Sequence, residues 1–406
     1  MPELVGLGSA PERGWLASEA AAEVLAEQDR AFADGEYDRR LVATRNAMVD
    51  AELDAMVVIR PSSVEYLCGY HSEETAPQPL LVTASETSIY VPDLEVGRAL
   101  ASARADTVLY CGYTDALRGL ELFTAHMATA LPAGARVGLE TRHASTPPDV
   151  LELLRRGGLE VVATDHLVER IRLRMSEAEV RCVELAATQT RHGVDAAVAA
   201  AAATDATDSS VAAAIASALF ATANSASAWG PVVATGRRAG IPHSSWVARP
   251  LSRAATFLEF AGAHHRYHAP VMRTLTLEQP DSDVRMLAEL ASTAVDAVLA
   301  AARPGVTCAE VATAAARAVG PLPQGVIFHH LFGYPVGLAH KPHWMDGAPF
   351  YIAADNQAPL EAGMVFHIPA SFRLFGRTGV GLSHTFVVEP SGARTLTHGR
   401  ARLIEV

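Results

Sequence analysis

The sequence has no excess of basic residues and no long apolar run. Its 33 lysines and arginines are outnumbered by 45 aspartates and glutamates, for a formal net charge of −12. Such a surface neutralises phosphates poorly, so we expect neither nucleic acid nor an anionic membrane as a partner. No apolar run approaches the roughly 18 residues of a spanning helix, and the N-terminal MPELVGLGSAPERGW lacks the basic and apolar regions of a signal peptide. We therefore expect a soluble, cytoplasmic protein.

Closely spaced cysteines and nucleotide-binding glycine motifs are also missing. The four cysteines lie far apart without a CxxC pair, which is typical of reduced, packed thiols rather than of a disulfide framework. The segments that resemble strands end in neither GxGxxG nor GxxxxGK[ST]. The sequence therefore gives no support for a nucleotide, and we expect no cofactor.

The first 170 residues alternate between helix-like and strand-like segments. Residues 16–53 are rich in strong helix formers at helical spacing. Short apolar strands are then expected in DAMVVIRP, PLLVTAS, TSIYVPD, DTVLYCGY, ARVGLET and LEVVATD. Ser176 and Glu179 have the spacing of a capping box that opens a long helix. We therefore predict an N-terminal α/β domain over residues 1–172 and a second domain over residues 173–406.

The second domain is expected to be α+β. Residues 177–222 are very rich in alanine, the best helix former, and predict two packed helices. Further helices are expected at 282–302 and 308–319, the latter with a capping box at Thr307 and Glu310. Strands are expected in PVVATG, ATFLEFAG, YHAPVMRTLTL, GMVFHIP and TGVGLSHTFVVEP. Helices followed by antiparallel strands indicate a catalytic α+β half.

Titratable residues gather in this second half, where eleven of the sixteen histidines follow residue 240. His243 follows a proline in a loop between two expected strands, where a side chain is easily presented to a ligand. Glu259 stands among Phe257, Leu258 and Phe260, and burial raises the pKa of a carboxyl group, as a proton-shuttling acid requires. The structural alternative is a buried ion pair of Glu259 with Arg266 or Arg273.

Five motifs, read in order, resemble the creatinase and aminopeptidase P superfamily, whose catalytic domain has the pita-bread fold. They are TGRRAGIPHSSW, FLEFAGAHHRYHAPVMRT, FGYPVGLAHKPHW, LEAGMVFHIP and TGVGLSHTFVVEPSG. The resemblance covers residues 177–406 and implies an N-terminal α/β domain of the expected size. It also implies a homodimer that acts on a small molecule.

The metal ligands of that superfamily have no counterparts here. Its metallopeptidases use two aspartates, a histidine and two glutamates, and the matching positions hold Glu259, Pro270, Tyr334, Pro369 (or Ile368) and His384. Proline and isoleucine cannot coordinate a metal, and tyrosine is a rare ligand for divalent ions. The resemblance therefore narrows to the metal-independent branch, which includes creatinase and is represented most closely by ectoine hydrolase, and we expect no metal.

The resemblance implies hydrolysis of a C–N bond in a small non-peptide amide or cyclic amidine. Without a metal to acidify water, a carboxylate must take a proton from water or attack directly. Glu259 is therefore expected to act as base or nucleophile, and His243 as proton donor to the leaving nitrogen. Further catalytic candidates are Tyr334 and His268. Candidates for substrate binding are His384, His367, Trp246, Phe332 and Trp344.

Two other functions stay open from the sequence. A rebuilt single-metal site would draw on Glu259 and on imidazoles from His243, His268, His330, His367 and His384. Alternatively, the chain is a non-hydrolytic enzyme, such as an eliminase or cyclase, or a binding protein that reuses the site. His384 stands where ectoine hydrolase has a late glutamate, so the substrate is expected to differ from ectoine.

Overall fold

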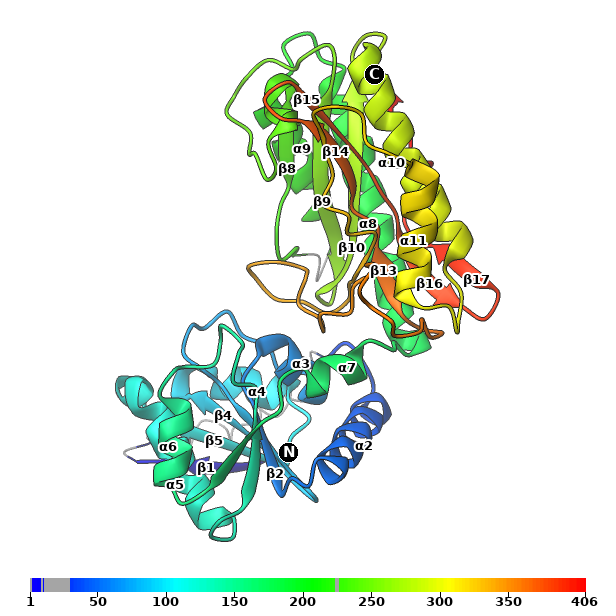
Figure 1. Cartoon of the computed structure of the whole chain (residues 1–406). Coiled ribbons are helices and arrows are strands. Elements are labelled where there is room, and N and C mark those ends of the chain that lie inside the picture. The colour runs from blue at the N-terminus through cyan, green and yellow to red at the C-terminus, as the bar shows by residue number, and fades with distance from the viewer. Residues whose placement is uncertain (1, 9, 11–29, 223–225) are drawn as a thin grey trace. The chain divides into compact units, whose positions relative to one another are not determined.

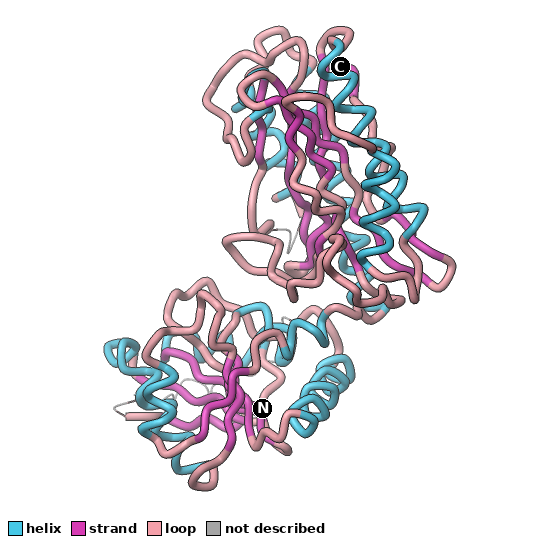
Figure 2. The backbone as a smooth tube through the Cα atoms, in the orientation of Figure 1, coloured by secondary structure: helices cyan, strands magenta, loops and turns pink. Residues whose placement is uncertain are grey.

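The computed structural model describes residues 2–8, 10, 30–222 and 226–406 (Figure 1). The chain divides into two compact units, Met1–Arg172 and Leu173–Val406. Secondary structure along the backbone is traced in Figure 2. Within the described residues, no helix is both long enough and apolar enough to cross a membrane. All four cysteines are buried and free, as the sequence predicts.

The first unit is a mixed sheet flanked by helices. Its strands are β1 (Glu3–Gly6), β2 (Ala55–Val58), β3 (Leu80–Thr83), β4 (Thr87–Pro92), β5 (Thr107–Cys111), β6 (Arg136–Leu139) and β7 (Glu160–Ala163), in the order β1-β5-β4-β3-β2-β6-β7. β3 runs antiparallel to β2 and β4, and the other pairs are parallel. The helices are α2 (Asp34–Asp50), α3 (Pro61–Cys68), α4 (Val96–Ser102), α5 (Gly119–Ala130), α6 (Val150–Arg156) and α7 (Leu167–Arg172). The helix expected over residues 16–53 is thus α2, and residues 16–29 lie outside the described residues.

Two buried carboxyl groups meet in the first unit. Glu140 follows β6, Glu169 lies on α7, and each is about 1% exposed. The Arg60 side chain pairs with Glu169 at 2.7 Å, and its backbone N–H donates to Glu140 at 3.3 Å. Burial, and then the charge of Glu169, raise the pKa of Glu140 to about 8. Glu140 therefore keeps its proton at neutral pH and donates it to Glu169.

We predict that the first unit loses stability as the pH rises from about 5 to about 8. A carboxyl group whose pKa is raised by folding stabilises the fold below its unfolded pKa of about 4.3 and loses that contribution as the pH rises through its folded pKa. In calorimetry of the full chain, the melting temperature of the neutral Glu140→Gln variant should depend less on pH over this range. An exposed control, Glu121→Gln, should follow the unmodified protein. Equal pH dependence in all three proteins would contradict the prediction.

The second unit places helices on two of its sheets. α8 (Glu177–Ala201) and α9 (Asp208–Leu219) pack on the sheet β18-β10-β9-β8, and α10 (Ser282–Ala301) packs on β14 and β15 (Figure 1). α11 (Cys308–Val319) lies against α10. The capping boxes at Ser176 and Thr307 form as predicted. The strands of the first sheet are β8 (Val232–Thr235), β9 (Thr256–His264), β10 (Tyr267–Thr276) and β18 (Ile404–Glu405).

Two further sheets complete the second unit. One contains β11 (Val326–Ile327), β14 (Ala370–Leu374) and β15 (Thr378–Leu382). The other contains β12 (Tyr334–Pro335), β13 (Val365–His367), β16 (Thr385–Glu389) and β17 (Gly392–Thr395). The single strand expected at 378–390 is therefore wrong. The chain breaks at Ser383 and His384 and passes from one sheet to the other, which hydropathy does not reveal because both halves are apolar.

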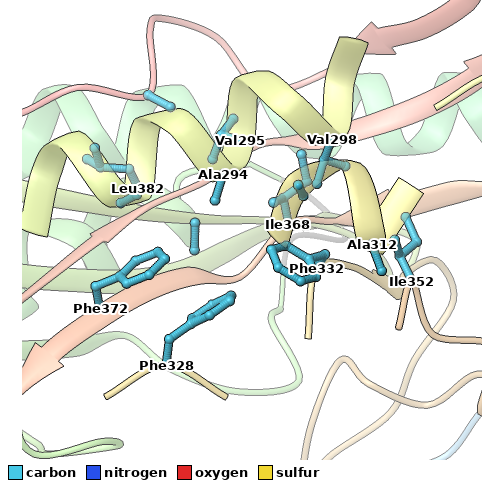
Figure 3. Packing of buried hydrophobic residues seen from close by; sticks show 14 of the residues in the cluster. Ala294, Val295, Val298, Ala312, Phe328, Phe332, Ile352, Ile368, Phe372 and Leu382 are labelled. Carbon is cyan, nitrogen blue, oxygen red and sulfur yellow. The ribbon is translucent and has the colours of Figure 1, made fainter. Parts of the chain in front are cut away.

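Two packing features fix the geometry of the second unit. A cluster of aliphatic and aromatic side chains fills the space between α10, α11 and the strands, with Phe332, Phe328 and Phe372 gathered beneath α10 (Figure 3). On the other sheet, Gly262 lets β9 approach α8 closely, because a Cβ at this position would lie 2.3 Å from the Ala186 carbonyl oxygen. The cluster therefore holds α10 and α11 on their strands, and Gly262 sets how closely β9 lies to α8.

Candidate active site

Glu259 lies in the middle of the central hairpin, on β9. It is paired with Val232 of β8 and Met272 of β10, so its side chain shares a face with theirs. The residue is only 4% exposed. Burial raises the pKa of its carboxyl group to about 7, an effect that the nearby charge of Arg373 partly opposes. This carboxyl group therefore exchanges its proton near neutral pH.

No ion pair neutralises Glu259 among the described residues. The Arg373 guanidinium instead donates to the Ala239 carbonyl oxygen at 3.0 Å and lies 4.8 Å from the centre of the Phe257 ring. Arg273 points to the opposite face of β10 and donates to backbone carbonyl oxygens. The buried ion pair considered from the sequence does not form, and the Glu259 carboxylate is left available for chemistry.

A hydrogen-bonded chain runs beside Glu259 through Tyr334, His367 and Ser383. The Tyr334 hydroxyl oxygen lies 2.7 Å from His367 Nδ1, and His367 Nε2 lies 2.8 Å from Ser383 Oγ. The Trp344 indole N–H donates to the same Tyr334 oxygen at 2.9 Å, and the Met272 backbone N–H donates to Ser383 Oγ at 2.6 Å. Burial and the Glu259 charge raise the pKa of Tyr334 well above its usual value of 10. Tyr334 thus stays a neutral hydroxyl near the carboxylate.

The donor and acceptor of each hydrogen bond in this chain are assigned by asking which hydroxyl hydrogen finds an acceptor. If Tyr334 donated to His367, the hydrogen of Ser383 would be buried without an acceptor among the described residues. If Ser383 donates to His367 and His367 donates to Tyr334, the free hydrogen is on Tyr334, whose hydroxyl is close enough to Glu259 to feel its charge. In the second arrangement the Ser383 hydroxyl hydrogen has an acceptor, His367 Nε2. It aims Tyr334 as a donor toward the Glu259 side of the site.

Aromatic contacts join His243 to this chain. The ring of Trp229 lies 5.3 Å from His243, 4.6 Å from His343 and 4.9 Å from Trp344, centre to centre. Burial, and then the charge of His243, lower the pKa of His343 to about 4. His243 itself is exposed on the loop after η4 (Gly236–Gly240). The Trp229 ring therefore lies between the exposed His243 imidazole and Trp344, whose indole N–H donates to Tyr334.

Two other histidines have their ring nitrogens engaged. His268 Nε2 accepts the Ala228 backbone N–H at 2.9 Å, so Nδ1 carries the proton that it shares with the Gly337 carbonyl oxygen at 3.3 Å. His268 therefore ties the chain before β8 to the chain after β12. His384 Nδ1 bonds to Thr397 Oγ1 at 3.0 Å, and burial and the charge of Arg273 lower the pKa of His384 to about 4. His384 is thus a neutral imidazole at physiological pH.

The two remaining aromatic candidates are not joined to this group. Phe332 is 3% exposed and belongs to the hydrophobic core under α10 (Figure 3). Trp246 is 40% exposed on the loop whose neighbouring residue, Val247, is tied to Asp208 at the start of α9. No described contact links either side chain to Glu259. The sequence shows aromatic character at both positions but not the direction in which the side chains point.

The residues of this site do not fit a divalent metal. Of the positions that match the ligands of the metallopeptidases, only Glu259 supplies a carboxylate. The Tyr334 hydroxyl is occupied by two hydrogen bonds, and Pro270 has no donor atom. In the described part of the chain, no group of three His, Cys, Asp or Glu side chains could hold a metal ion. The rebuilt single-metal site considered from the sequence has no support in this geometry.

Four contributors to the site escaped the sequence reasoning. Trp229 and His343 stack on each other, Ser383 ends the hydrogen-bonded chain, and Arg373 acts on Glu259 electrostatically. These residues come from four separate segments that only the tertiary fold brings together. His343 and Ser383 lie within two of the five motifs, but Trp229 and Arg373 lie outside all of them and had no signal in the sequence.

Comparison with known proteins identifies both units. Residues 40–174 match the creatinase/prolidase N-terminal domain, and residues 181–390 match metallopeptidase family M24. An uncharacterized hydrolase/peptidase, y4tM, of Sinorhizobium fredii is 28% identical over 390 residues, which cover 90% of this chain and 96% of that protein. Ectoine hydrolase of Halomonas elongata is 29% identical over 169 residues, 41% of each chain.

Solved structures share the fold over nearly the whole chain. Dipeptidase PepE from Mycobacterium ulcerans superimposes with a TM-score of 0.77 and 26% identity, covering 92% of this chain and 99% of that one. Together with the two family models, this similarity confirms the two-domain α+β pita-bread architecture that the motifs predicted.

Proposed function

Because the chain belongs to metallopeptidase family M24 yet carries residues that do not fit the metals of such enzymes, we propose that it is a metal-independent hydrolase. Its substrate class is a small non-peptide amide or cyclic amidine, in which it breaks a C–N bond. The observation that carries the proposal is Glu259, a buried carboxyl group without an ion pair whose pKa is raised to about 7. Such a group can accept a proton from water at neutral pH.

The proposed reaction uses three side chains. Ionised Glu259 takes a proton from water, whose oxygen attacks the amide or amidine carbon, or the carboxylate attacks that carbon directly and water later releases the product. Tyr334 donates its free hydrogen to the oxygen or nitrogen on which negative charge develops. As the C–N bond breaks, the His243 imidazole ring gives a proton to the leaving nitrogen. The bond electrons stay with that nitrogen, so hydrolysis is balanced without a redox partner.

We predict that the purified protein carries no stoichiometric transition metal and that a chelator leaves its amidase activity unchanged. The physical reason is the donor set, because two ligand positions hold Pro270 and Tyr334, whose hydroxyl oxygen already accepts two hydrogen bonds. Elemental analysis and assays before and after EDTA treatment test this, and added manganese should not raise the rate. About one zinc or two manganese ions per chain, lost together with activity, would refute the prediction.

The substrate is expected to be neutral or acidic rather than cationic. His384 is a neutral imidazole beside the charge of Arg273, and the resemblance implies a glutamate at this position in the ectoine-hydrolase type. A charge acts more strongly in a desolvated site than in water, so a neutral His384 in place of a glutamate weakens binding of a cationic ring. Calorimetry should show weak ectoine binding, improved about tenfold or more by His384→Glu and unchanged by the neutral control His384→Gln. Tight binding and hydrolysis of ectoine by the unmodified protein would identify it instead as an ectoine hydrolase.

A further inference from the structure

Arg273 is a buried cation without an anionic partner among the described residues. It lies on β10 and is 2% exposed. Its Nη1 donates to the carbonyl oxygens of Met272 at 2.9 Å and Ser383 at 2.7 Å, and its Nη2 donates to that of His398 at 2.9 Å. Burial lowers the pKa of Arg273 to about 10, which still leaves it charged at neutral pH. Within the described part of the chain, only carbonyl dipoles offset this charge.

The guanidinium group also keeps hydrogen-bonding capacity. An arginine has five N–H donors, and three of them are used here. The Nε–H and one Nη2–H have no acceptor among the described residues. Neighbouring donors of this kind suit the paired oxygens of a carboxylate or phosphate. A buried charge with unused donors is costly unless a ligand completes it.

A cavity of about 250 Å³ borders Arg273 on the α8 side of β10. Its lining includes Arg191 from α8 and Arg400 from the segment before β18, together with Thr190 and Thr397. Asp195 is the single acidic residue of the lining, against three arginines. This concentration of positive charge stands out in a protein with a formal net charge of −12. The exposed Arg191 and Arg400 contribute charge where the lining meets solvent, and Arg273 forms its buried wall.

We propose that this cavity binds a small oxyanion, held by the free N–H donors of Arg273 and by Arg191 and Arg400. Phosphate, sulfate and the carboxylate of a small metabolite share the required chemistry, which is two or more oxygens that accept charge-assisted hydrogen bonds. The cavity is large enough for such an ion with some of its water. The bound anion supplies the negative charge that the protein does not provide within the described residues.

An anion bound in the cavity would act on the candidate active site through Arg273. Arg273 holds the Ser383 carbonyl oxygen, and the Ser383 hydroxyl bonds to His367. The charge of Arg273 also contributes to the lowered pKa of His367, which is about 3 and is due first to burial. An anion beside Arg273 weakens that electrostatic effect, so the pKa of His367 rises. An anion in the cavity therefore affects, across β10, the hydrogen-bonded chain of Ser383, His367 and Tyr334.

The test is calorimetric titration of the full chain with phosphate, sulfate and acetate at constant ionic strength set with sodium chloride. We expect saturable binding of at least one of these oxyanions. Phosphate or sulfate binding more tightly than acetate would indicate a tetrahedral ligand, and the reverse order would indicate a carboxylate. Both orders support the site. Absence of saturable binding by all three ions would overturn the proposal.

Substitutions at the exposed arginines locate the binding without disturbing the core. Arg191→Gln and Arg400→Gln should each weaken binding by about tenfold or more, because each removes a charged donor. Arg402→Gln is the matched control, since Arg402 is exposed near Arg400 but does not line the cavity. Binding that persists at full strength in the Arg191→Gln/Arg400→Gln double variant would refute the site. These binding measurements do not depend on amide hydrolysis, so they test the cavity independently of the proposed function.

Discussion

Replacing Glu259 with glutamine is expected to lower turnover by about 10² or more while the fold stays intact. Glutamine has nearly the same shape but can neither accept the proton of water nor attack a carbonyl carbon. In the unmodified protein, kcat/KM should fall as the pH drops below about 7, because protonation of Glu259 removes the reactive carboxylate. Steady-state rates across a pH series measure both effects.

The same substitution separates catalysis from stability. The folded-state pKa of Glu259 is raised, so its contribution to stability is present at low pH and is lost as the pH rises through about 7. At pH 8 the Glu259→Gln variant should therefore melt no lower than the unmodified protein. Glu289→Gln, an exposed substitution on α10, is the control for the loss of one charge. Undiminished turnover by Glu259→Gln would place the reactive group elsewhere.

His243→Asn is expected to reduce turnover of unactivated amides by about 10², through loss of the proton donor to the leaving nitrogen. Asparagine suits this position because His243 has a φ of 55°, a left-handed conformation that asparagine tolerates. The loss should shrink for a nitroanilide, whose leaving nitrogen needs less help from an acid. Rates with both substrate types measure this difference.

His330→Asn is a matched control for that experiment. His330 is also exposed and has a φ of 55°, so its replacement tests the same backbone effect away from Trp229. We expect its turnover to stay close to that of the unmodified protein. Equal losses for the two substrates in His243→Asn would mean that His243 does not act as the general acid.

The sequence predicts the elements of the second unit well because local signals agree there. Capping boxes begin α8 and α11 at Ser176 and Thr307, and apolar runs mark β8, β9 and β10. It misses β14, whose residues contain serine and arginine although all are buried. Burial of Arg373 depends on the Phe257 ring and on a carbonyl from another segment, which no local pattern encodes.

For the site, the sequence predicts which single residues have reactive side chains but not how those residues are arranged. Glu259 and His243 follow from residue type and surroundings, and Tyr334 follows from the resemblance to a family. Their relation to one another depends on Trp229 and Ser383, which link segments far apart in the chain. The roles of His268 as an anchor and Phe332 as a core residue depend on which way the side chains point. Sequence spacing alone does not determine that direction.

Pro270 has a consequence for any attempt to build a metal site here by single substitutions. In the register of the hairpin it pairs with Ala261, two residues beyond Glu259, and its side chain lies on the same face as Glu259. An aspartate introduced at this position alone would bury a second carboxylate near the first, with no cation among the described residues in contact with either, and like charges in such a place repel. A metal would need further ligands that this single change does not supply. Pro270→Asp alone is therefore expected to destabilise the fold rather than to create a metal site.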